Sequence, residues 1–309
     1  MSSPKQLKAA WYVGLAYAVW GFFPIYWKAL AGISALELIS HRIVWSFVLL
    51  AVMIARSDEF KVLRQALRSP RIVGIYSVAA IAIATNWLIF VWAVGISQIV
   101  QISLGYFINP LLNVVLGVVF LHERLSRAQW IAVALAAAGV LWLTVQFGQP
   151  PWIAICLALS FALYGLLRKL LAIDAVAGLG VESVYLFLPA LALLAWGESH
   201  GQGGFFSAWG AGIDVLLIVG GALTALPLIG FAFAVRRVPL SVVGLLQYIA
   251  PTLQFLTGVF VFHEAFDQQR LVGFVFIWIG LAIFAVDGAL RSRRPAVAAT
   301  VAPATASEA

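Results

Sequence analysis

The second long apolar stretch of the chain contains three ionisable side chains, those of Glu37, His41 and Arg42. Glu37 and His41 are four residues apart, so a helix places them on one face. A histidine beside a carboxylate titrates near neutral pH, which suits proton coupling or the anchoring of a polar substrate. The competing interpretation is structural. Ser34 and Glu37 have the spacing of a capping box at a helix start, and Arg42 then reaches a carboxylate or a carbonyl.

Further polar side chains lie within later apolar stretches, where a polar group is costly and needs a partner or a task. Glu182 is the rough counterpart of Glu37 in the second half of the chain. Amides and phenols add candidate substrate contacts, and their alternative role is hydrogen bonding between helices. These candidates are Asn86, Tyr106, Asn109, Gln247, Tyr248 and Gln254. Pro110 and Pro251 are expected to kink their helices and to leave carbonyls free to meet a ligand.

Several aromatic side chains lie near these polar groups in the sequence. Rings suit apolar or cationic solutes, and their alternative roles are packing and anchoring at the membrane surface. The candidates for an aromatic lining are Trp20, Trp87, Trp92, Tyr106, Tyr164 and Tyr248.

No residue set predicts an enzyme, a bound metal or a cofactor. His122 and Glu123 resemble the start of a zinc-protease motif, but Ser126 stands where the second histidine is required. Cys156 is the single cysteine, so the sequence predicts neither an intramolecular disulfide nor a cysteine-based metal cluster. A glycine-rich phosphate loop of the Walker type is absent from the sequence, which argues against ATP as the energy source.

The elements that must position these groups are membrane-spanning helices. The chain is 63% hydrophobic and 10% charged, whereas soluble proteins contain roughly 25% charged residues. Ten apolar runs are each long enough to cross a bilayer as a helix, and they lack the alternation of barrel strands. The sequence therefore predicts an all-α integral membrane protein with ten transmembrane helices. The predicted spans are 9–28, 35–55, 72–94, 99–121, 128–146, 151–170, 178–197, 213–235, 239–262 and 271–290.

Lysine and arginine predict the orientation of these spans. Of the 19 basic residues, all but Lys28, Arg42 and Arg270 fall on one side of the predicted membrane, and Arg42 lies within a span. Basic loops face the cytoplasm, so both termini are expected there, in a multi-pass protein of the bacterial inner membrane. The net charge of +7 is thus explained by topology, and nucleic acid is not expected as a partner.

The two halves of the chain repeat one another with opposite topology. Segment 106–123 matches segment 247–264 at seven of eighteen positions, in a register of 141 residues. Each half contains five spans, and an odd number inverts the second copy, as in many secondary transporters. We therefore predict a first five-helix repeat at 1–148, an inverted second repeat at 149–290, and a disordered cytoplasmic tail at 291–309. An alternative is that the duplication serves folding alone.

Short motifs give the chain a resemblance to a known family. They include Ala-Tyr-Ala-Val-Trp-Gly from Ala16, Gly-Tyr-Phe-Ile-Asn-Pro-Leu from Gly105, Leu-His-Glu-Arg-Leu from Leu121 and Gln-Tyr-Ile-Ala-Pro-Thr from Gln247. Over about residues 9–290 the chain resembles RarD-type proteins of the EamA family, in the drug/metabolite transporter superfamily. The resemblance implies ten helices, a central cavity between the halves, and export of metabolites or drugs. It also implies an association with chloramphenicol sensitivity.

Taken together, the sequence predicts a secondary transporter or permease, in the export direction, working by alternating access. Its expected partners are a small-molecule substrate, membrane lipid and protons, with a homodimer contact through the fifth and tenth helices left open. A membrane-embedded enzyme would need a close catalytic set, and none stands out. The remaining alternative is a membrane sensor or assembly partner that transports nothing.

Overall fold

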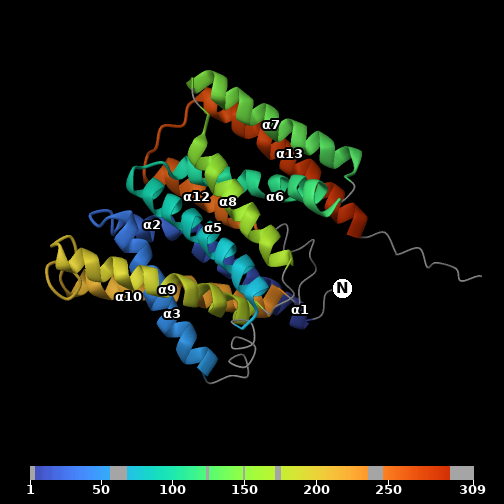
Figure 1. Ribbon diagram of the computed structural model, residues 1–309. Coiled ribbons are helices and arrows are strands. Elements are labelled where there is room, and N and C mark those ends of the chain that lie inside the picture. The colour runs from blue at the N-terminus through green and yellow to red at the C-terminus, as the bar shows by residue number, and fades with distance from the viewer. Residues whose placement is uncertain are drawn as a thin grey trace, which may run out of the picture.

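The computed structural model describes residues 4–55, 68–122, 125–148, 150–170, 175–235 and 246–292, and their regular structure is entirely helical (Figure 1). Seven helices in these ranges are long and apolar enough to cross a membrane, and two shorter apolar helices accompany them. The prediction of an all-α membrane protein with about ten helices is confirmed. The predicted tail after Ser292 lies outside the described residues.

Helices occupy all ten predicted spans. In the first half they are α1 (Pro4–Gly21), α2 (Phe23–Lys28), α3 (Ala35–Ala55), α5 (Pro70–Gly95), α6 (Ile99–Leu121) and α7 (Arg127–Phe147). In the second half they are α8 (Trp152–Leu170), α9 (Ala175–Ser199), α10 (Ala211–Val235), α12 (Ile249–Leu256) with the π-helical turn η1 (Thr257–Val261), and α13 (Gln268–Ser292). The start of the predicted ninth span lies outside the described residues.

The first predicted span is interrupted at Phe22, between α1 and α2. Pro24 lies in the first turn of α2 and has no N–H, so it cannot bond to the carbonyl of Trp20. The side-chain amide of Gln254, on α12, donates to that carbonyl instead, at 3.3 Å. The break is a consequence of Pro24, and a helix of the second half satisfies the carbonyl that the break releases.

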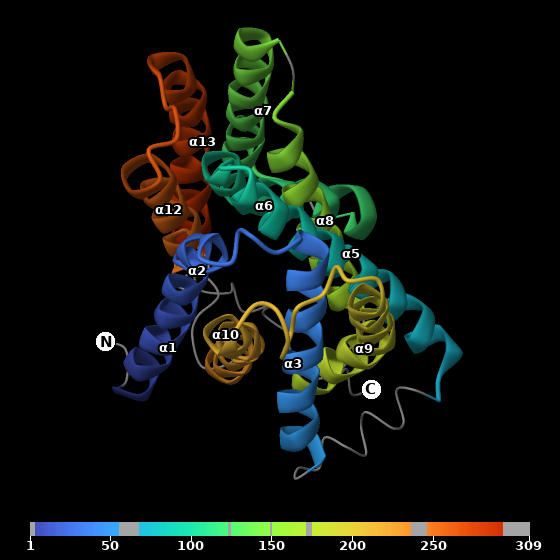
Figure 2. The same ribbon diagram turned by 90° about the vertical axis from the view of Figure 1, so that its left-hand side faces the viewer.

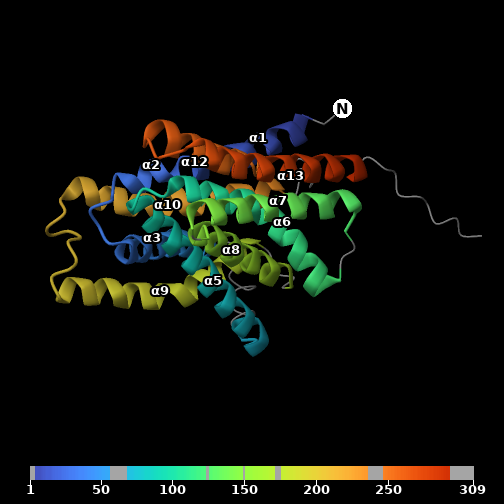
Figure 3. The same cartoon turned by 90° about the horizontal axis from the view of Figure 1, so that it is seen from above.

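Helices from the two halves interleave throughout the bundle. α7 packs along α13, α6 along α8, and α3 between α9 and α10 (Figure 2). Most helices run along a common axis, with α2 and the α9–α10 connection at one end and the start of α1 toward the other (Figure 3). Contacts between the halves occur in matching pairs. The contact of α1 with α12 corresponds to that of α8 with α6, and the contact of α3 with α10 corresponds to that of α9 with α5.

The α7–α13 contact shows this exchange at single residues. Gly139 lies so close to α13 that an added Cβ would be 2.6 Å from the carbonyl oxygen of Gly273. Gly280 lies against α7 in the same way, with an added Cβ 2.7 Å from the carbonyl oxygen of Ala132. A shift of 141 residues converts Gly139 into Gly280 and Ala132 into Gly273. The same contact is therefore made twice, with the two helices interchanged.

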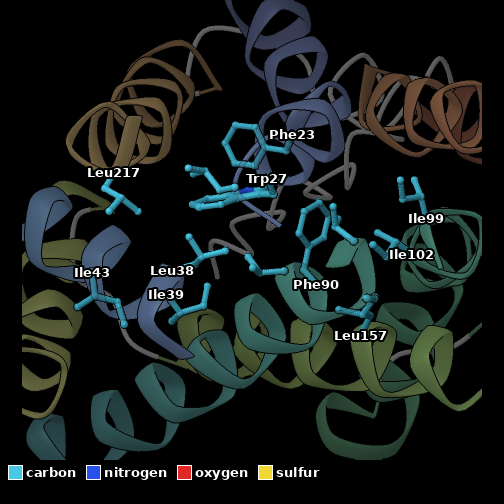
Figure 4. Packing of buried hydrophobic residues seen from close by; sticks show 14 of the residues in the cluster. Phe23, Trp27, Leu38, Ile39, Ile43, Phe90, Ile99, Ile102, Leu157 and Leu217 are labelled. Atoms are coloured by element: carbon cyan, nitrogen blue, oxygen red, sulfur yellow. The ribbon is translucent and has the colours of Figure 1, made fainter. Parts of the chain in front are cut away.

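The larger apolar core lies where α2, α3, α5, α6, α8 and α10 converge (Figure 4). Phe23 and Trp27 project from α2 toward Leu38 on α3 and Phe90 on α5. Leu157 on α8 is fully buried in the same cluster. The short helix α2 thus brings two large rings into the middle of the bundle, where they meet the polar residues described next.

Candidate functional site

Arg42 is the centre of the candidate site. Its side chain leaves α3 within the apolar core and is only 5% exposed. The guanidinium carbon lies 4.1 Å from the ring centroid of Trp87 on α5. The rings of Phe23 and Trp27 on α2 follow at 5.7 and 5.6 Å. We call these four residues the arginine cage. Three helices build it, and two of its three rings come from α2.

The guanidinium of Arg42 has no polar partner among the residues that the structure describes. Its Nε is fully enclosed without a hydrogen bond. The phenols of Tyr26 and Tyr106 interact electrostatically with the guanidinium, and both hydroxyl groups donate elsewhere. Tyr26 donates to the carbonyl of Leu216, and Tyr106 donates to Oδ1 of Asn86 at 3.0 Å. The cage therefore surrounds the cation with rings and leaves its N–H groups free.

The free energies of these interactions show what the arginine cage lacks. A charged side chain at the centre of a spanning helix costs about 2.5–3.5 kcal/mol or more. A ring face contributes about 0.5–2 kcal/mol to a nearby cation, and only Trp87 is close enough for the upper end of that range. The three rings together offset much of the cost of the charge. They do not satisfy the N–H donors, and each buried donor without a partner costs about 1–3 kcal/mol. An acceptor brought to Arg42 would recover that energy.

A polar network lies beside the cage and joins three helices. Asn86 on α5 is fully buried, and its Nδ2 donates to the carbonyl of Leu157 at 2.9 Å and to Oγ of Ser160 at 3.0 Å. Its Oδ1 accepts from Tyr106 on α6, as described above. Both N–H groups of the Asn86 amide are engaged, and its oxygen accepts one hydrogen bond. The network positions Tyr106 and leaves Asn86 with no free side-chain donor for a ligand.

Glu182 on α9 is the second buried charge-bearing group of this region. Its side chain is 4% exposed and accepts from the hydroxyl of Tyr164 at 3.2 Å. Glu182 and Trp87 line a small cavity of about 20 Å³ between α3, α5 and α9, which is room for about one water molecule. Trp87 therefore contacts Arg42 and also lines the cavity with Glu182.

Comparisons with known proteins agree on one family. The model of the EamA-like transporter family matches residues 7–145. A Vibrio cholerae protein named "Uncharacterized transporter" is 46% identical over 274 residues, which cover 88% of this chain and 90% of that protein. Protein RarD of Streptomyces exfoliatus is 43% identical over 279 residues, covering 90% and 88%. The chain belongs to the EamA family, in its RarD branch. It is a multi-pass bacterial membrane transporter.

The fold of this RarD-type protein is also found in a solved structure. A protein crystal structure superposes with a TM-score of 0.58 at 18% identity, covering 95% of this chain and 100% of that chain. At that identity the likeness concerns the fold alone. The arginine cage is therefore described on this chain's own contacts.

In this EamA-family protein, Glu37 and His41 lie apart from the arginine cage. Glu37 shares a hydrogen bond of 3.1 Å with the hydroxyl of Ser34, and that hydroxyl accepts the Glu37 backbone N–H. The His41 ring packs on Phe205 and Trp209 of the α9–α10 connection, with centroids 4.7 and 6.1 Å apart. The structure therefore places Glu37 in a capping arrangement and His41 against an aromatic loop.

The other amide and phenol candidates lie toward α6 and α12. Gln254 bonds to the Trp20 carbonyl, as described above. Tyr248 packs in a second apolar cluster with Phe255 and Trp278. Asn109 is buried on α6, and its Oδ1 has no hydrogen-bond partner. Gln247 is half-buried just before α12.

Sequence reasoning missed the contribution of α2. Phe23, Tyr26 and Trp27 were not among the candidates, although two of them form half of the arginine cage. The available signal is Pro24 inside a run of aromatic residues, which predicts a helix break that redirects the rings.

Two charged residues fasten the end of the bundle where α2 lies. Glu264 accepts the backbone N–H groups of Ile99 and Val100 with its two oxygens, at 2.6 and 2.8 Å. A carboxylate is favoured there because the first N–H groups of α6 have no helical partner. Lys28 donates to the carbonyl of Val94 at 3.2 Å and to the hydroxyl of Ser97 at 2.7 Å. We call this pair of interactions the end clasp.

An open hollow of about 530 Å³ lies beside the end clasp. Its lining includes Gln98, Gln101, His263, Glu264 and Arg270, and none of the residues of the arginine cage. The hollow thus belongs to the end of the bundle. The arginine cage remains a buried charged centre within the bundle, and its four residues all belong to the first half of the chain.

Proposed function

We propose that the protein is a secondary transporter that exports small metabolites or drugs across the bacterial cytoplasmic membrane by alternating access. The observation that carries this proposal is the reciprocal pair of contacts at Gly139 and Gly280. It supports two inverted five-helix repeats, 1–148 and 149–290, because a glycine of α7 packs on α13 in the same way as the matching glycine of α13 packs on α7. Two related halves can rock about a central site and expose it to either side.

The end clasp fits one end state of that cycle. Glu264 belongs to the second repeat and holds the start of α6, which belongs to the first repeat. Rocking of the repeats must therefore release Glu264 from Ile99 and Val100. In this proposal basic loops face the cytoplasm, so the clasp ties the two repeats together on the periplasmic side, beside the open hollow.

We assign proton coupling, as part of the same proposal, to Glu182. A carboxyl group in a spanning helix is a functional candidate because its burial is costly. Glu182 is 4% exposed, hydrogen-bonds to Tyr164 and shares a cavity with Trp87. A change in the charge of Glu182 would therefore alter the electrostatic potential at Trp87, which belongs to the arginine cage.

Transport by the purified full-length protein in proteoliposomes tests the proposal. The vesicles would be loaded with chloramphenicol, because RarD of Pseudomonas aeruginosa is named a chloramphenicol-sensitive protein. Separate vesicles would be loaded with indole-3-acetate, as an aromatic carboxylate. We expect protein-dependent efflux of at least one probe, slower in Glu182→Gln and altered by a pH gradient. Efflux equal to that of protein-free vesicles would count against transport. Tight binding to another membrane protein in its place would favour the sensor or assembly alternative.

A further inference from the structure

We propose that Arg42 binds the anionic group of the transported solute, so that the substrates are small organic anions with an apolar or aromatic body. This inference rests on the proposed transport function and specifies the substrate class. It begins from a cation that is 5% exposed and has no hydrogen-bond or ion-pair partner among the described residues.

The charge of Arg42 is permanent under physiological conditions, because the guanidinium does not release its proton. A buried cation is normally paired with an anion. The described carboxylates near this region bond to other groups. Glu37 bonds to Ser34, and Glu182 accepts from the hydroxyl of Tyr164 at 3.2 Å. Oδ2 of Asp214 accepts the backbone N–H of Phe206 at 3.2 Å, whereas its Oδ1 has no hydrogen-bond partner. Within the described part of the chain, none of these carboxylates forms an ion pair with Arg42.

The shape of the guanidinium favours a planar anion. A guanidinium presents its N–H groups in a fixed fork that matches the two oxygens of a carboxylate. The guanidinium carbon lies over the Trp87 ring at 4.1 Å, and the Phe23 and Trp27 rings are more distant. These rings supply no carboxylate or carbonyl oxygen, so the donors of the fork remain to be satisfied by a ligand. A neutral carbonyl would accept one bond and leave the charge uncompensated.

The surroundings of the cage suit an apolar body attached to that anion. Leu38 and Ile39 on α3 and Phe90 on α5 belong to the same buried cluster as Phe23 and Trp27. Glu182 lines the small cavity that Trp87 also lines. A second negative charge at that end of the solute would be repelled by an ionised Glu182. Monoanions are therefore the expected class.

Binding to the full-length protein in a neutral detergent tests the inference with matched probes. The probes are indole-3-acetate and phenylacetate, each compared with its neutral amide, indole-3-acetamide or phenylacetamide. Ligand-induced shifts of the unfolding temperature report binding. On the wild-type protein we expect the carboxylates to bind at least about tenfold more tightly than the amides. This comparison needs no variant, so it stands even if changes at Arg42 impair folding.

Three variants test whether Arg42 causes the preference for carboxylates over amides. Arg42→Gln is expected to bind carboxylate and amide equally, and Arg42→Lys to keep part of the preference because it retains charge without the planar fork. Arg127→Gln removes an exposed arginine at the start of α7 and is expected to behave as wild type. Equal binding of carboxylates and amides by the wild type would overturn the inference. So would a preference that persists in folded Arg42→Gln, or no carboxylate binding up to about 10 mM.

The result is separable from the outcome of the transport experiment. Efflux of neutral chloramphenicol without any carboxylate preference would retain the transporter and refute the anion site. Carboxylate binding that depends on Arg42, without flux of any probe, would retain the site and refute transport.

Discussion

His122 and His263 adopt the same left-handed backbone conformation, with φ of 54° and 51°, at positions 141 residues apart. Residues other than glycine rarely adopt it. His122 directly follows α6, and His263 follows the turn η1 that extends α12. Two copies of one sequence motif therefore end their helices by the same departure from helical geometry. With the reciprocal contacts of Gly139 and Gly280, this supports common descent of the halves from one five-helix unit.

Gly139→Leu and Gly280→Leu are expected to destabilise the protein to similar extents. A side chain at either position meets a backbone carbonyl at 2.6 or 2.7 Å, and overpacking of this kind costs about 1–3 kcal/mol. The unfolding temperature in detergent measures the effect. Gly74→Leu is the matched control, because an added Cβ there has no neighbour within 4 Å. A loss of stability in only one of these two variants would contradict the equivalence of the Gly139 and Gly280 contacts.

Arg42 and Trp87 are expected to be energetically coupled. A double-mutant cycle with Arg42→Met and Trp87→Leu should give a coupling of about 0.5–2 kcal/mol, as for a cation over a ring face. Unfolding in mixed micelles measures the four proteins. Trp92→Leu serves as the control for Trp87, since Trp92 is partly exposed and its ring is tilted against that of Trp152, with the centroids 5.4 Å apart. If the effects of Arg42→Met and Trp87→Leu on the free energy of unfolding were additive, the contact between the two side chains would contribute nothing to stability.

Asn86→Leu is expected to destabilise the bundle by about 1–3 kcal/mol, because the hydroxyl of Tyr106 and the carbonyl of Leu157 would lose their buried partner. Thermal unfolding measures the loss. Asn113→Leu, at an exposed position on α6, is the control and should change the unfolding temperature little. An unchanged unfolding temperature in Asn86→Leu would mean that the Asn86 network does not stabilise the bundle.

Glu264→Gln is expected to speed amide hydrogen exchange at the start of α6. The variant replaces a charge-assisted interaction, worth about 1.5–3 kcal/mol, by a weaker neutral one. Exchange followed by mass spectrometry on peptides covering Ile99 and Val100 gives the readout. Glu198→Gln alters a carboxylate that accepts from Phe205 on the α9–α10 connection, and it should leave α6 unchanged. Unaltered exchange in Glu264→Gln would remove the end clasp from the proposed cycle.

Much of the fold could be predicted from the sequence because membrane helices are local features. An apolar run of about 20 residues fixes a helix whatever its neighbours are, so the prediction of about ten apolar helices was correct, apart from the break in the first span and the undescribed start of the ninth. The break at Phe22 follows equally locally from Pro24. It was missed because the aromatic residues around Pro24 continue the apolar run.

The candidate site was less accessible to sequence reasoning. Spacing shows that Glu37 and His41 share a helix face, but it does not show what lies against that face. Ser34 engages Glu37, and Phe205 covers His41 from a connection more than 160 positions away in the chain. Arg42 was a candidate because an arginine within a span is unusual. Its cage depends on α2 and α5, and that packing is a tertiary property.

The break at Phe22 also bears on how solute preference can evolve. α2 contains only six residues, and two of them supply rings to the arginine cage. Substitutions in this short helix can reshape the cage while the hydrogen bonds of the long helices stay intact. Changes of specificity among relatives are then expected to concentrate between Phe23 and Trp27. A combinatorial library limited to these positions would be a compact starting point for redirecting the protein to new solutes.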